Sequence, residues 1–125
     1  MGIDFSHTDA HWSYTGFSRF RTALATFEGI NLDAMRGFRE DGKPWETVTT
    51  PLKPLLDHSD CDGDMSPADC ATVAARLRHV VDELWPAETS TWELNPEASL
   101  NRSNGLLLAD GMEAAARAGE RLEFC

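Results

Sequence analysis

The stretch SPADCATVAARLRHVVDELWP, residues 66–86, predicts the central helix of the fold. Ser66 is a suitable N-cap, Pro67 fits the first helical position and Asp69 follows three residues after the cap, a typical start of a helix. Because Pro86 cannot continue a helix, we expect the helix to span residues 66–85. Its apolar residues recur at i, i+3, i+4 and i+7, which predicts one buried face. They are Cys70, Val73, Ala74, Leu77, Val80, Val81, Leu84 and Trp85.

A second helix is predicted over residues 11–28, where large apolar side chains recur at helical spacing. They are Tyr14, Phe17, Phe20, Leu24 and Phe27. Thr8 or Asp9 can serve as its N-cap, and Gly29 is expected to end it. Rings at this spacing are typical of a core face, so we expect them to pack inside the protein.

A third helix is predicted over residues 97–118, with Gly119 as its C-cap and a break near Asn104 and Gly105. Its apolar set is Ala98, Leu100, Leu107, Leu108, Met112, Ala115 and Ala116. Residues 86–96 connect the helix over residues 66–85 to the helix over residues 97–118. They are polar and predict a surface loop over which Trp92 folds back.

The remaining segments predict short elements. Residues 31–50 are expected to form a loop with one helical turn near residues 32–38, and Pro51 to begin a short helix over residues 51–56. Residues 3–5 and 121–125 alternate in hydrophobicity and can pair as a two-stranded clip that joins the termini. The expected fold is therefore mainly α, a single small domain over residues 1–125 with three principal helices.

Charge and length limit the classes of function. The chain has 125 residues, 42% of them hydrophobic, and its 21 acidic against 11 basic residues give a net charge of −10. This charge repels phosphate backbones and anionic lipids, which disfavours nucleic acid and membranes as partners and favours a cation or a basic protein surface. No run of 18 apolar residues and no signal-like N-terminus is present, so we expect a cytoplasmic protein.

An acidic loop precedes the central helix, with the sequence DHSDCDGDMSPADC at residues 57–70. It partly matches an EF-hand calcium loop, with Gly63 at the turn position and His58 where the first acid belongs. This interpretation predicts a degenerate calcium or magnesium site. Its ligands would be Asp60, Asp62, the Asp64 carbonyl, a water held by Ser66, and Asp69. The alternative interpretation is a metal-free turn in which Ser66 caps the helix and Asp64 complements the helix dipole.

A competing interpretation of the same loop is a zinc site built from nitrogen and sulfur ligands. It would use His58, Cys61 and Cys70, with His7, His11 or Cys125 as the fourth ligand. If water occupied one position, Asp57 or Asp60 could act as the base of a hydrolytic reaction. A third hypothesis makes Cys61 a nucleophile beside His58 and near a helix N-terminus. An odd number of cysteines, three, favours thiols or metal ligands over a structural disulfide.

Three segments of the chain together resemble a family of small uncharacterised proteins found in bacteria and their phages. They are the N-terminal MGIDFSH (residues 1–7), the central LDHSDCDGDMSP (residues 56–67) with Cys70, and the closing AGERLEF (residues 118–124). The shared patterns are MGxDxSH and HSDCDGxxSPxxC. The resemblance implies a cytoplasmic single domain from an accessory or mobile-element gene, and it implies no particular activity.

The leading functional hypothesis is a non-enzymatic binding or adaptor module whose acidic loop is structural or binds a cation weakly. Its partner would be a protein surface or a small molecule, and a second copy of the chain is a further candidate. One alternative is a phage-type accessory protein that sequesters a nucleotide-like immune signal or blocks a host defence protein, with Arg121 joining the ligand-binding residues. Another is a small metallohydrolase. The candidate ligand-binding residues are His7, His11, Trp12, Tyr14, Arg19 and Arg21.

Overall fold

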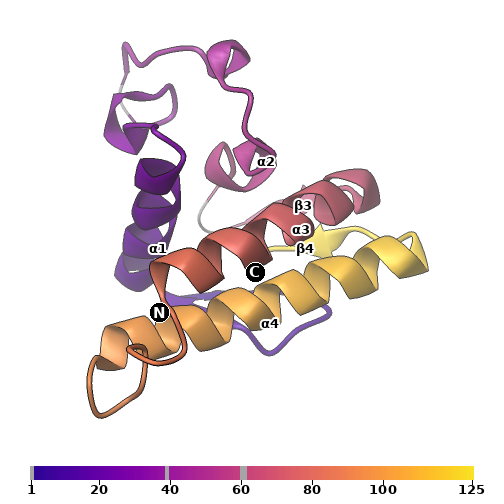
Figure 1. Ribbon diagram of the computed structural model, residues 1–125. Helices are drawn as coiled ribbons and strands as arrows, with labels where there is room; N and C mark the ends of the chain where they lie inside the picture. The colour runs from indigo at the N-terminus through magenta and orange to yellow at the C-terminus, as the bar shows by residue number, and fades with distance from the viewer. Residues whose placement is uncertain (1, 39, 60–61) are drawn as a thin grey trace.

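Two long helices, α3 (Pro67–Leu84) and α4 (Pro96–Ala118), lie side by side in this computed structural model and form the base of the fold (Figure 1). Helix α1 (Tyr14–Phe27) crosses one end of the pair, and the segment that follows α1 lies beyond it. The structure describes residues 2–38, 40–59 and 62–125. The fold is mainly α with small two-stranded sheets, as the sequence predicts.

The predicted central helix is confirmed. The Ser66 side chain accepts a hydrogen bond of 3.1 Å from the backbone N–H of Asp69, and Pro67 occupies the first turn. Trp85 is the C-cap, because Pro86 follows it and has no N–H to donate. Six of the predicted apolar positions are buried: Cys70, Val73, Ala74, Leu77, Val80 and Val81.

Helix α4 is continuous, so the predicted break near Asn104 and Gly105 is wrong. Asn95 caps its start through a 3.1 Å hydrogen bond from the Ala98 N–H, and Gly119 ends it at a φ of 68°. Gly105 marks a close helix contact instead of a break. A Cβ atom at this position would lie 2.8 Å from Val81 Cγ2 and 3.2 Å from the Phe20 ring. The glycine therefore lets α4 approach α1 and α3 closely.

Helix α1 begins at Tyr14, three residues later than predicted. Residues His11–Ser13 form strand β2, which pairs antiparallel with β1 (Gly2–Asp4). Ser13, not Thr8 or Asp9, is the N-cap and accepts a 3.0 Å hydrogen bond from the Gly16 N–H. The hydroxyl of Thr8 donates to the Leu107 carbonyl instead. The strand pairing removes residues 11–13 from the helix because their backbone groups are used by β1.

The two chain ends meet, but the predicted clip is reduced to one bridge, Phe5 with Phe124. Backbone hydrogen bonds from Ser6 to Glu123 and from Cys125 to Asp4 flank this bridge. The main partner of strand β4 (Leu122–Glu123) is strand β3 (Asp64–Met65). The C-terminal tail therefore contacts the N-terminal segment only around Phe5, while Leu122 and Glu123 pair with β3.

The segment between α1 and α3 contains two 3-10 helices, η1 (Leu32–Ala34) and η2 (Trp45–Thr47), and the short helix α2 (Lys53–Leu56). The predicted turn near residues 32–38 is thus confirmed. Helix α2 begins at Lys53 and not at Pro51. Trp45 is buried, and its indole N–H donates to the Arg36 carbonyl over 2.8 Å. This hydrogen bond connects η2 to the residues that follow η1. Within the described part of the chain, no helix is long and apolar enough to cross a membrane.

One shielded ion pair connects α1 to α3. The Arg76 guanidinium donates two hydrogen bonds, of 2.7 and 2.8 Å, to the carboxylate of Glu28, whose side chain is 8% exposed. The hydroxyl of Thr50 donates a third. The hydrogen bonds from Arg76 are the main reason that the pKa of Glu28 lies below its ordinary value, against the opposing effect of burial.

This ion pair predicts a pH-dependent contribution to stability. A carboxyl group whose pKa is lowered by folding stabilises the protein above its unfolded pKa, about 4.3 for glutamate, and loses this effect as pH falls through the folded pKa. Glu28→Gln is expected to lower the melting temperature at pH 7 by a few degrees, and this deficit is expected to shrink as pH falls through the lowered pKa of Glu28. Thermal unfolding at several pH values measures this; an equal deficit at all pH values would contradict it. Exposed Glu83→Gln is the control.

Candidate functional site

The described residues of the acidic loop have structural contacts. Asp60 and Cys61, which belong to the calcium and zinc hypotheses respectively, lie outside the described residues. The Asp64 carboxylate pairs with Arg121 over 2.9 Å, and Ser66 caps α3. Asp62 and Asp69 are exposed. No three His, Cys, Asp or Glu side chains are placed to hold a metal ion in residues 2–38, 40–59 and 62–125. Both metal hypotheses therefore stay predictions.

Three described residues of the zinc hypothesis, His58, Cys70 and Cys125, have the following environments. The Nδ1 and Nε2 atoms of His58 each lie 2.9 Å from a carbonyl oxygen, of Ser59 and Asp64, and its ring stacks on Phe124. Cys70 is buried, and this burial raises the pKa of its thiol, which disfavours the thiolate that zinc requires. Cys125 is exposed at the chain end.

The two N-terminal histidines pair with acids on the surface. His7 lies 3.0 Å from Glu120, and His11 lies 2.8 Å from Asp4. Asp57, a proposed base in the hydrolase hypothesis, lines a cavity of about 400 Å³ with Arg21, Arg36 and His58. Desolvation raises the pKa of Asp57.

Of the predicted ligand-binding residues, His11, Trp12 and Arg19 line a common cavity, which has a volume of about 410 Å³. Trp12 contributes little free surface to it, because the residue is 5% exposed and its ring centre lies 4.5 Å from that of Phe20. Its indole N–H donates to Asn101 Oδ1 over 3.2 Å. Tyr14 is half-buried against the core.

Arg21 is buried, and the contacts described here are with other parts of the fold. It is 3% exposed, and its Nη1 atom donates to the carbonyls of Leu55 and His58, which lie in and after α2. Its guanidinium also lies 5.0 Å from the centre of the Phe17 ring, one helical turn earlier. Arg19 pairs with Glu97 and Arg121 with Asp64. Arg19 and Arg21 line different cavities, and Arg21 shares its cavity with Arg36. Nucleotide binding by these arginines therefore stays a prediction.

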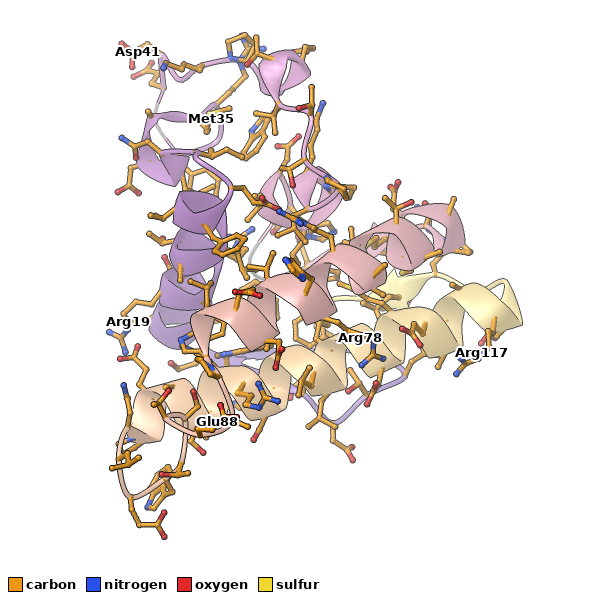
Figure 2. The ribbon with its side chains drawn as sticks, viewed as in Figure 1. Arg19, Met35, Asp41, Arg78, Glu88 and Arg117 are labelled. Carbon is orange, nitrogen blue, oxygen red and sulfur yellow. The ribbon has the colours of Figure 1, made fainter. Side chains whose placement is uncertain are left out.

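The sequence analysis missed an exposed apolar surface at the end of the α3/α4 pair. Trp92 is 61% exposed and Leu94 is 69% exposed in the loop between the two helices, so Trp92 does not fold back as predicted. Leu100, on the first turns of α4, is 50% exposed. We call Glu88, Trp92, Glu93, Leu94 and Leu100 the loop-end surface. Figure 2 places this loop, marked by Glu88, at the same end of the molecule as Arg19.

Arg19 and Glu97, which form an ion pair of 2.9 Å, line two cavities near this end of the molecule. The first is the 410 Å³ cavity described above, and Leu100 forms part of its wall. The second, of about 400 Å³, is lined by Trp85 and Asn95 at the two ends of the loop. Leu100 of the loop-end surface therefore borders a hollow that can receive a side chain of a partner.

The loop-end surface is acidic. Between Arg78 and Arg102 the chain contains five acids and no lysine or arginine. Two of them are neutralised, Asp82 by Arg102 and Glu97 by Arg19. The others have no ion-pair partner within the described part of the chain; they are Glu83, Glu88 and Glu93. Two large apolar residues within an acidic, base-free loop were the sequence signal for this site.

The exposed apolar side chains of this surface can supply binding energy when a partner buries them. Comparison of the chain with protein-family models, with curated proteins and with solved structures finds no significant match. The resemblance to a family of bacterial and phage proteins thus stays a prediction, and a function must be inferred from the geometry of the chain itself.

Proposed function

We propose that this protein is a non-enzymatic binding module that holds a cationic, partly apolar segment of another protein on its loop-end surface. The observation that carries the proposal is the exposure of Trp92 and Leu94 beside Glu88 and Glu93. Tryptophan is enriched among the residues that dominate binding energy at protein interfaces. Burying large side chains that are exposed in the free protein supplies the apolar part of that energy.

The loop is held in place before a partner binds. The Ser90 N–H donates to the Pro86 carbonyl over 2.9 Å, and Ser90 itself is buried. The Asn95 N–H donates to the Thr91 carbonyl over 2.9 Å, and the Leu94 N–H donates to the Thr91 hydroxyl. A loop ordered by its own hydrogen bonds loses less conformational entropy on binding, which raises affinity for a given contact area.

Charge selects the class of partner. The carboxylates of Glu88 and Glu93 flank the apolar side chains, and the chain as a whole carries a charge of −10. Lysine or arginine side chains of a partner would meet these carboxylates at the rim, where charge pairs mainly set the association rate and the selectivity. The partner chemistry that fits is therefore an apolar stripe bordered by basic residues, as on one face of a basic amphipathic helix.

Calorimetric titration with a synthetic helix of leucine and lysine, roughly 18 residues or five turns long, tests the proposal. We expect the helix to bind, and Trp92→Ala to weaken binding by about 30-fold, equivalent to about 2 kcal/mol. The double variant Glu88→Gln with Glu93→Gln is expected to weaken binding and its dependence on salt.

Matched variants elsewhere on the surface provide the controls. Phe38 is 37% exposed outside the loop-end surface, and Phe38→Ala should leave affinity unchanged. Glu46→Gln is the corresponding charge control. Equal affinity for a leucine–glutamate helix, or an unchanged affinity of Trp92→Ala, would contradict the proposal. So would sedimentation data in which the free protein is a dimer that Trp92→Ala dissociates, because the surface would then join two copies.

A further inference from the structure

A separate cavity, of about 550 Å³, lies between the end of α1, the segment that contains η1 and η2, and α3. Its volume is within the range of about 300–1,000 Å³ that is usual for small-molecule sites. The apolar part of its lining includes Ile30, Met35 and Val48. None of its lining residues belongs to the loop-end surface, so it can be considered independently of the proposed function.

Backbone hydrogen bonds fix the rim of this cavity. The Lys43 N–H donates to the Ala34 carbonyl, and the Lys43 carbonyl accepts from the Arg36 N–H, each over 2.9 Å. Gly42 permits this approach, because a Cβ atom at its position would lie 2.3 Å from the carbonyl carbon of Met35. The backbone of Lys43 is thus held at the rim while its side chain remains exposed.

Three charged residues line the cavity, and one of them, Lys43, is not neutralised by an ion pair with a described residue. Glu28 and Arg76 line one wall, but each neutralises the other through two hydrogen bonds, and Thr50 donates a further one to Glu28. Glu28 is therefore not available to bind a cationic ligand. The third charged residue of the lining, Lys43, has no ion-pair partner in residues 2–38, 40–59 and 62–125.

Two neutral side chains add uncommitted hydrogen-bond donors to the same cavity. The Asn31 amide and the Thr49 hydroxyl line it and make no hydrogen bond to another described residue. We infer that the cavity binds a small organic anion, a carboxylate or phosphate monoester on an apolar body. Lys43, Asn31 and Thr49 would bind the anionic group. Ile30, Met35 and Val48 would pack against the apolar body.

The test uses the fact that the chain has two lysines, Lys43 and Lys53, of which only Lys43 lines the cavity. Both are converted to ¹³C-dimethyl-lysine, which keeps the charge, and their NMR signals are assigned with the variants Lys43→Met and Lys53→Met. Benzoate and phenyl phosphate are titrated as probes, with benzamide as a neutral molecule of the same shape. We expect a saturable shift of the Lys43 signal and an unchanged Lys53 signal.

The variants and probes separate the outcomes. Lys43→Met is expected to weaken binding of the anions at least tenfold, measured by calorimetry, and Lys53→Met to leave it unchanged. A response to benzoate alone identifies a carboxylate site, and a response to phenyl phosphate alone identifies a phosphate site. No saturable shift with either anion, equal binding of benzamide, or equal shifts of both lysines would overturn the inference. None of these results depends on Trp92.

Discussion

Phe20→Ala is expected to lower the free energy of unfolding by about 3–5 kcal/mol, the usual cost of truncating a buried phenylalanine. The Phe20 ring is fully buried, and it packs against Trp12 at 4.5 Å and Trp85 at 5.4 Å between ring centres. It also lies against the backbone of Gly105. Because these neighbours come from three different elements, they cannot easily close the space that the ring leaves. Urea unfolding followed by circular dichroism measures the loss.

Phe27→Ala is the matched control, since Phe27 lies on the same helix and has the same apparent core spacing in sequence. It is 39% exposed, so its truncation is expected to cost about 1 kcal/mol or less. Similar losses for the two variants would contradict the described core. A loss below about 1 kcal/mol for Phe20→Ala would show that the aromatic cluster can repack around the missing ring.

Arg21→Ala is expected to destabilise the protein by about 3 kcal/mol, because it removes a donor from the buried Leu55 carbonyl and from the partly buried His58 carbonyl. The contact of the guanidinium with the Phe17 ring is lost as well. Since the Arg21 side chain connects α1 to the end of α2, amide hydrogen exchange of α2 should increase more than that of α4. Urea unfolding and hydrogen exchange measure the two effects.

Arg19→Ala, two residues earlier on the same helix, is the control. Its ion pair with Glu97 is exposed at the surface, and such pairs contribute about 0–1 kcal/mol. If Arg19→Ala destabilised the protein as much as Arg21→Ala does, the assignment of Arg21 to the interior would be contradicted. The comparison separates a structural arginine from a surface arginine in nearly the same sequence context.

The helices were largely predictable because their signals are local. Ser66 with Pro67, and Gly119 at a positive φ, are capping residues whose effect depends only on neighbours in the chain. The start of α1 could not be predicted in the same way. Residues 11–13 are periodic enough to extend the helix, but β1 pairs with them, and this pairing is a contact across a turn that periodicity does not reveal.

The candidate site was less predictable than the fold. The sequence offers Arg21 as one of several arginines for a ligand pocket, and only its contacts with the Leu55 and His58 carbonyls show that it is buried. The sequence predicts that Trp92 folds back over its polar loop, yet the residue is 61% exposed. For both residues, the amino-acid type does not determine whether the side chain is buried. The tertiary contacts around each residue determine it.

By itself, the sequence determined the mainly α class, the bounds of α3, the C-terminal end of α4 and the acidic character of the surface, because caps, periodicity and charge act over a few residues. Only the tertiary structure decided which arginine is buried, which aromatic ring is exposed and which lysine lies at a cavity. Those properties depend on which faces of separate elements meet, and residues far apart in the chain, such as Phe20 and Gly105, set that packing together.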